Sequence, residues 1–137
     1  MRNGWMLIMC GFVGLLALTA LASEKAPSDF VSAMQTIAAA QAAATKATAA
    51  EDYDTVEKHA AAIVDAFPVI EKYWSARSPD VLPMVRSAAK AASDLRVSSQ
   101  QRSLEGVAYS AKELSAACAN CHAAHRETMP DGTFQIK

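Results

Sequence analysis

The chain has 137 residues, three cysteines and a formal net charge of −1 at neutral pH, and 52% of its residues are apolar. This length suits a single domain. The nearly balanced charge and the lack of a basic patch argue against nucleic acid as a partner. Serine, histidine and carboxylate residues occur without a catalytic motif around them, so we do not expect an enzyme.

The first 22 residues have the pattern of a secretory signal peptide. Arg2 supplies a positive charge, residues 5–21 are mostly apolar, and Ala20-Leu21-Ala22 is an Ala-x-Ala cleavage site. The alternative is an uncleaved membrane anchor, because an apolar run of about 18 residues is close to the length that spans a bilayer. The cleavage site favours removal after Ala22. We therefore expect a periplasmic protein with no membrane contact after cleavage.

Residues 23–137 form the predicted mature domain, which loses Cys10 with the signal peptide. It retains two cysteines, both in one short motif, and a net charge of about −2 once Arg2 is removed. No further thiol remains for a disulfide. Small exported domains usually need stabilisation beyond their own core, so we expect a cofactor to supply it.

Two helices are expected in the first half of this domain. The first spans about residues 28–48, with Ser28 as its N-cap and an apolar face that begins at Phe30. The second is the best patterned, with Asp52 or Asp54 expected to cap or complement its N-terminus. Its core face is predicted to contain Tyr53, Val56, Ala60, Ile63, Phe67, Ile70 and Trp74.

The second half predicts two more helices. The third begins near residues 80–83, and its inner face contains Val81, Val85, Ala88, Ala92 and Leu95. The fourth begins near Ser99 and continues to a turn at Pro130, after which residues 133–137 form a short tail. Because the connections are short, neighbouring helices should be antiparallel. We predict an all-α, up-down-up-down four-helix bundle.

The fourth helix carries the motif Cys118-Ala119-Asn120-Cys121-His122. Cys-x-x-Cys-His is the attachment pattern of a c-type haem, in which two thiols form thioethers and the imidazole ligates the iron. Residues three and four apart share one face of a helix, so both sulfurs and His122 can approach one flat cofactor. The motif continues the core stripe of its helix. We therefore predict one covalent haem c, attached to the last helix and placed inside the bundle.

Two other interpretations of the cysteine pair are weaker. A thioredoxin-like pair belongs to a strand-helix-strand pattern, with its thiolate at a helix N-terminus, and no strand is predicted nearby. A zinc site would need Cys118, Cys121, His122 and His125, which extend over about 10.5 Å of one helix. Four ligands within about 2.3 Å of one ion do not easily come from such a stripe.

A haem motif at the end of the last helix of a four-helix bundle resembles the class II cytochromes c. The resemblance covers about residues 28–129, and Cys118-x-x-Cys121-His122-x-x-x-Arg126 is its specific part. It implies that Arg126 lies near the proximal imidazole of His122. Two positions depart from the family pattern, because His125 replaces a usual aromatic residue and Phe30 stands where many members have a basic one.

The ligand on the distal face of the haem decides the function class. In low-spin members of the family a methionine early in the first helix binds the iron, and Met34 stands at that place. The resemblance then implies a one-electron carrier with redox proteins as partners. The alternative for Met34 is core packing, which implies an open distal face and a gas-binding cytochrome c-prime for NO or CO. The sequence leaves homodimerisation open, and it assigns no role to His59 or His125.

Overall fold

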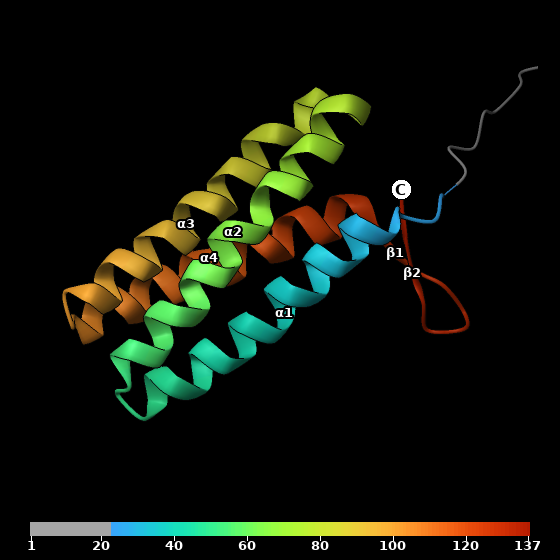
Figure 1. The fold of residues 1–137 in the computed structure, drawn as a ribbon. Coiled ribbons are helices and arrows are strands. Elements are labelled where there is room, and N and C mark those ends of the chain that lie inside the picture. The colour runs from blue at the N-terminus through green and yellow to red at the C-terminus, as the bar shows by residue number, and fades with distance from the viewer. Residues whose placement is uncertain (1–22) are drawn as a thin grey trace, which may run out of the picture.

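The computed structural model describes residues 23–137, and the predicted signal peptide at residues 1–22 lies outside these described residues. The helices are α1 (Ser28–Ala49), α2 (Tyr53–Arg77), α3 (Leu82–Gln100) and α4 (Leu104–His125), with a 3-10 turn, η1 (Pro79–Val81), before α3. Each helix packs against the next one along the chain (Figure 1). The domain is an all-α, antiparallel up-down-up-down bundle of four helices.

The helix boundaries differ from the prediction at the starts of α1 and α4. Asp52 caps α2 as predicted, because its carboxylate accepts a hydrogen bond from the amide of Thr55 at 3.1 Å. Ser28 is not an N-cap, since Pro27 occupies that position and the helix begins at Ser28 itself. The prediction that the fourth helix begins near Ser99 is also wrong. The third helix continues to Gln100, and Arg102, with a φ of 51°, reverses the chain before α4.

The core follows the predicted stripes on α2 and α3, except that Tyr53 is only half-buried. Its buried apolar residues on these helices and η1 are Val56, Ala60, Ile63, Phe67, Ile70, Trp74, Val81, Val85, Ala88, Ala91, Ala92 and Leu95. Apart from Phe30 and Ile37, the buried residues of α1 are all alanines. Met34 and Gln41 are only partly buried. Small side chains let helices approach closely. Met34 and Gln41 therefore lie at the edge of the core, whereas Phe30 and Ile37 lie within it.

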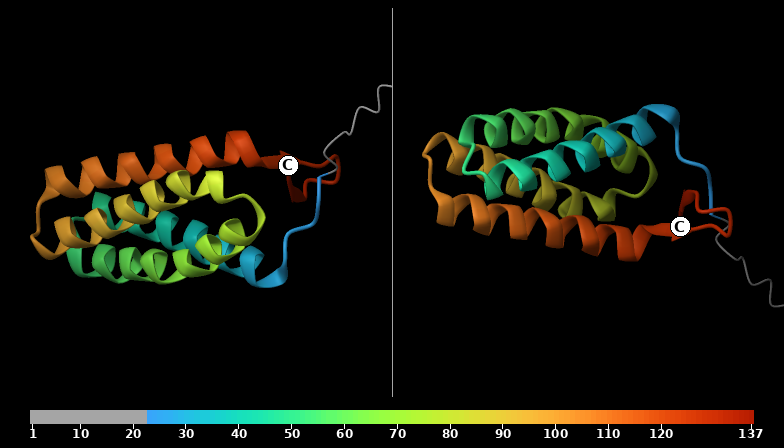
Figure 2. Two further views of the ribbon diagram at one scale, coloured as in Figure 1. Left: turned by 90° about the horizontal axis from the view of Figure 1, so that it is seen from above. Right: turned by 90° about the horizontal axis from the view of Figure 1, so that it is seen from below.

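The first and last helices, α1 and α4, face each other but pack together only loosely. Helices adjacent in the chain pack along their length, whereas α1 and α4 make few contacts with each other (Figure 2). One hydrogen bond crosses between them, from Gln41 Nε2 to Ser115 Oγ at 2.8 Å. We call this boundary between α1 and α4 the open seam.

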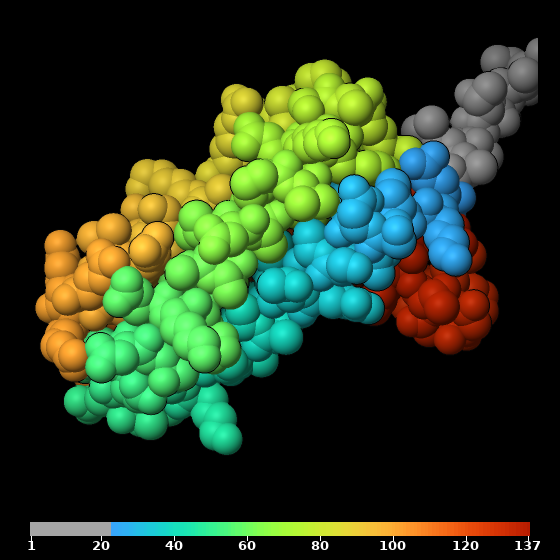
Figure 3. Space-filling model, viewed as in Figure 1, coloured from blue at the N-terminus to red at the C-terminus, as the bar shows by residue number. Residues whose placement is uncertain are grey.

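The C-terminal end folds as a hairpin instead of the predicted helix and tail. The last helix ends at His125, and β1 (Arg126–Thr128) pairs antiparallel with β2 (Phe134–Ile136). Ile136 is only 5% exposed, and its backbone pairs with that of Glu24 in the N-terminal segment. Burial of this side chain explains why the last residues order. The hairpin and the N-terminal segment lie together at one end of the bundle (Figure 3).

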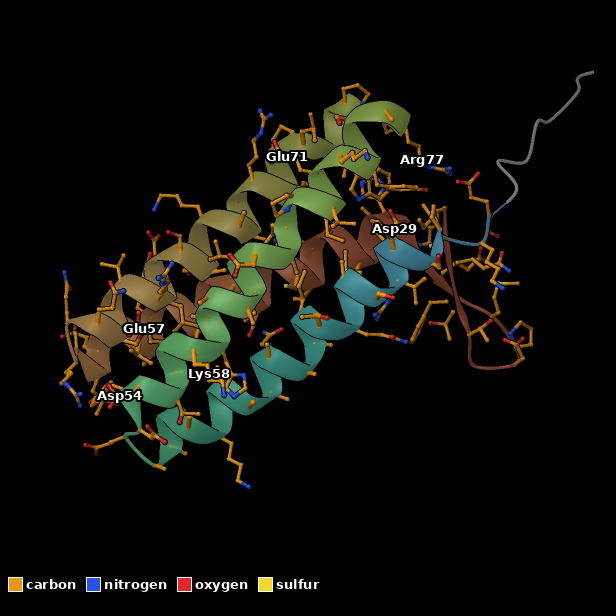
Figure 4. All side chains as sticks on the ribbon, in the orientation of Figure 1. Asp29, Asp54, Glu57, Lys58, Glu71 and Arg77 are labelled. Atoms are coloured by element: carbon orange, nitrogen blue, oxygen red, sulfur yellow. The ribbon has the colours of Figure 1, made fainter. Side chains whose placement is uncertain are left out.

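Ion pairs lie on the outside of the bundle. Glu57 and Glu71 of α2, labelled in Figure 4, pair with Arg96 and Arg86 of α3 at 3.7 and 2.7 Å. Exposed pairs of this kind contribute about 0–1 kcal/mol each. The apolar core therefore holds the helices together.

Two leucines of α4 test this view of the core. Leu114 is fully buried, whereas Leu104 on the same helix is 48% exposed. We expect Leu114→Ala to lower the free energy of unfolding by about 2–5 kcal/mol, because it leaves a cavity. Leu104→Ala, the matched control, should change it by about 0.5 kcal/mol or less. Chemical denaturation measures both, and equal losses would contradict the assignment of the core.

Candidate functional site

The Cys-x-x-Cys-His motif occupies the last turns of α4. Cys118 and Cys121 are free thiols, half-buried and packed against the edge of the hydrophobic core. His122 follows directly and is also half-buried. The three side chains are therefore at the boundary between core and solvent, where a covalently attached group can reach both.

Burial decides the chemistry of the two thiols. It raises the pKa of Cys118 and of Cys121, and the proximity of Cys121 raises the pKa of Cys118 further. Redox-active thiols of the thioredoxin kind instead have a lowered pKa, at the N-terminus of a helix. Here both thiols are protonated at neutral pH and lie at the C-terminal end of α4. These shifts are opposite in direction to the one that activates a thiolate.

His122 is held in its neutral form. Burial lowers the pKa of its imidazole, and the positive charge of Arg126 lowers this pKa further. A neutral imidazole has a free ring nitrogen that can bind a metal, whereas an imidazolium ion does not. His122 is therefore in the protonation state that iron ligation requires.

A hollow of about 480 Å³ adjoins the motif on the side of the open seam. Its lining residues are Gln41, Ser115, Cys118, Ala119, His122, Ala123, Arg126 and Thr128. Ligand sites in proteins usually enclose about 300–1,000 Å³. The hollow is therefore large enough to hold part of a cofactor beside the motif.

Arg126 lies near His122, as the resemblance implies, but on a different element. It is the first residue of β1 rather than part of the helix, and it lines the same hollow as His122. Its guanidinium carbon lies 4.4 Å from the centroid of the Phe134 ring on β2. The two strands of the hairpin thus bring the Phe134 ring against this charge.

Met34 lies on the α1 face that turns toward the open seam. The bond between Gln41 and Ser115 marks one level of the antiparallel pair α1 and α4. Met34 lies about two turns before Gln41, and His122 lies about two turns after Ser115. Because the two helices are antiparallel, Met34 and His122 lie at about the same height along the bundle axis. Met34 packs partly buried against the core and does not line the hollow. Its position is compatible with either ligation or packing.

An aromatic cluster occupies the same end of the bundle. The ring of Trp74 on α2 lies 5.1 Å from that of His125 on α4 and 6.4 Å from that of Phe30 on α1, measured between centroids. The prediction that Trp74 is a packing residue is confirmed, because its side chain is 3% exposed. Its contact with His125 was not predicted, since no spacing in the sequence indicates a contact between α2 and α4.

His59, to which the sequence assigns no role, is half-buried on α2 and does not line the hollow. Within residues 23–137, no three His, Cys, Asp or Glu side chains converge as a metal-binding group. A haem iron takes only one or two ligands from the protein, so this finding concerns other metal sites. No helix in the described part of the chain has the length and apolar character to cross a membrane.

Comparisons of the chain with protein-family models, with curated proteins and with solved structures found no match. The function must therefore be argued from the site itself. Its donor set fits a covalent haem c, because two neutral thiols and a neutral imidazole share one stretch of helix beside a hollow. No other group of residues in the described chain brings together donors of this kind.

Proposed function

We propose that this protein is an exported mono-haem cytochrome of the class II type that carries single electrons between redox proteins in the periplasm. The observation that carries the proposal is the motif Cys118-x-x-Cys121-His122 on the last turns of α4, beside the hollow at the open seam. The signal-peptide pattern agrees with it, because c-type haem proteins of this kind work outside the cytoplasm.

Each residue of the motif has a role in this proposal. Cys118 and Cys121 would hold the haem by two thioethers, and the neutral imidazole of His122 would ligate the iron. Arg126 would lie beside that imidazole with a fixed positive charge. The haem, when bound, supplies reversible one-electron chemistry, and the protein supplies its ligands, burial and orientation. A carrier needs no catalytic side chain, and we propose none.

A second candidate function is gas binding by a cytochrome c-prime with an open distal face. It is favoured by one observation, that Met34 does not line the hollow beside His122. If no side chain ligates the iron opposite His122, small molecules such as NO or CO can reach it. The two functions share the attachment chemistry and differ only in the distal ligand.

Covalent attachment is tested on protein expressed with its signal peptide in a host that attaches haem c. We expect acidified organic solvent to leave the haem on the wild-type protein, because thioethers resist extraction. The pyridine spectrum of the wild-type protein should indicate that both haem vinyl groups are saturated. In the single variants Cys118→Ala and Cys121→Ala it should indicate one saturated vinyl group. Haem that is extracted completely from the wild type would contradict the proposal.

A further inference from the structure

One buried polar atom near the motif has no hydrogen-bond partner. The Nε1–H group of Trp74 is inaccessible, and no acceptor lies within reach of it in the described part of the chain. Burial of an N–H group without an acceptor is unfavourable, so nearly all such groups in proteins are paired. This donor therefore lacks an acceptor among residues 23–137.

The indole lies close to the haem motif. Its ring packs against His125, which follows Cys121 by four residues and His122 by three, so these residues share a face of α4. Phe30 and Tyr73 contact other sides of the same ring. The donor is thus enclosed at the same end of the bundle as the motif, and Trp74 lies outside the lining of the hollow beside His122.

The carboxylate of Glu24, which contacts Tyr73 of the cluster, already has two partners. The Glu24 carboxylate pairs with the guanidinium of Arg77 and accepts a hydrogen bond from the Tyr73 hydroxyl at 3.1 Å. These groups lie on the outer side of Tyr73, whereas Trp74 is in the interior. Among residues 23–137, no group accepts a hydrogen bond from Trp74 Nε1.

We propose that the Trp74 Nε1–H group donates a hydrogen bond to a propionate carboxylate of the attached haem. This inference rests on the proposed function. A haem carries two carboxylates, and a carboxylate forms a stronger hydrogen bond with an N–H donor than a neutral acceptor does. The bond would fix the rotation of the haem about its attachment to α4. Trp74 is thus a positioning residue for the polar edge of the cofactor.

The test removes the donor and keeps the shape of the side chain. Trp74 is the only tryptophan after residue 22, so benzothienylalanine, which has sulfur in place of N–H, can replace it in a tryptophan auxotroph. We expect the haem content to be unchanged. One propionate bending band in the haem Raman spectrum should shift, and the reduction potential should fall, because the positive end of the N–H dipole no longer faces the haem.

Two more measurements make the test decisive. Ultraviolet Raman spectra of the wild-type holoprotein should report a hydrogen-bonded indole, and Trp74→Phe should shift the same propionate band. Tyr109→Phe is the matched control, because Tyr109 lies 65% exposed on α4, and it should shift nothing. If the variants keep a full haem content and the propionate band does not shift, the inference is wrong, but the proposed function stands. This is also the result expected if a water molecule is the acceptor. A wild-type protein without covalent haem overturns the proposed function as well.

Discussion

The double variant Cys118→Ala/Cys121→Ala should lose its haem and, with it, much of its folding stability. On α4 the buried residues are Val107, Ser110 and Leu114, and none of the described residues of this helix beyond Leu114 is buried. The last turns of α4 therefore need another apolar surface to pack on. A loss equal to one large core side chain, about 3 kcal/mol, would lower the Tm by about 12 °C.

Circular dichroism measures this effect on the haem-loaded wild type and on the haem-free variant. We expect a smaller helical signal and a broader melt in the variant, since its small core lacks the area that the cofactor supplies. Ala116→Ser, at an exposed position of α4, is the control and should melt like the wild type. A cooperative melt of the double variant at the wild-type temperature would count against a structural role of the haem.

The fold was predictable from the sequence where large apolar residues recur at helical spacing. The stripe from Val56 to Trp74 predicts the buried face of α2, because only one face of a helix can carry it. In the alanine-rich α1, large apolar residues do not mark one face so clearly. Its buried face includes Ala33 and Ala40 rather than Met34 and Gln41, since α1 approaches its neighbour on its small side chains.

The C-terminal hairpin was not predictable in this way. Its order depends on the backbone pairing between Ile136 and Glu24, which lie at opposite ends of the described residues 23–137. Three-residue strands carry too short a pattern to be distinguished from a tail. The structure therefore adds a hairpin that holds Arg126, where the sequence predicts only more helix and a turn.

In the candidate site, too, local features could be predicted from the sequence, and contacts between distant segments could not. Haem attachment is local in sequence, so the spacing of Cys118, Cys121 and His122 is sufficient to predict it. The contact between Trp74 and His125 arises from helices that are not adjacent in the chain, and its unpaired N–H group is visible only in three dimensions. The groups that would orient a cofactor are thus harder to predict than those that would bond to it.

Met34→Leu should convert the reduced holoprotein from low-spin to high-spin. Leucine keeps the volume of the side chain and removes the thioether, so the electron-carrier proposal requires the distal coordination position to open. We expect CO to bind faster, because no ligand has to leave first, and the reduction potential to fall, because a methionine ligand raises it. Optical spectra, stopped-flow mixing with CO and a redox titration measure the three effects.

Met34→Ala and Met84→Leu complete this experiment. The first should also open the iron, and the second, at a half-buried methionine of α3, should leave the spectrum unchanged. Met34 is excluded as the ligand if the wild-type protein is already high-spin and neither Met34 substitution changes its spin state. Met34→Ala would then only lower the free energy of unfolding, by about 2 kcal/mol or less for a half-buried side chain. That result would favour the gas-binding function, since His122 would be the only protein ligand to the iron.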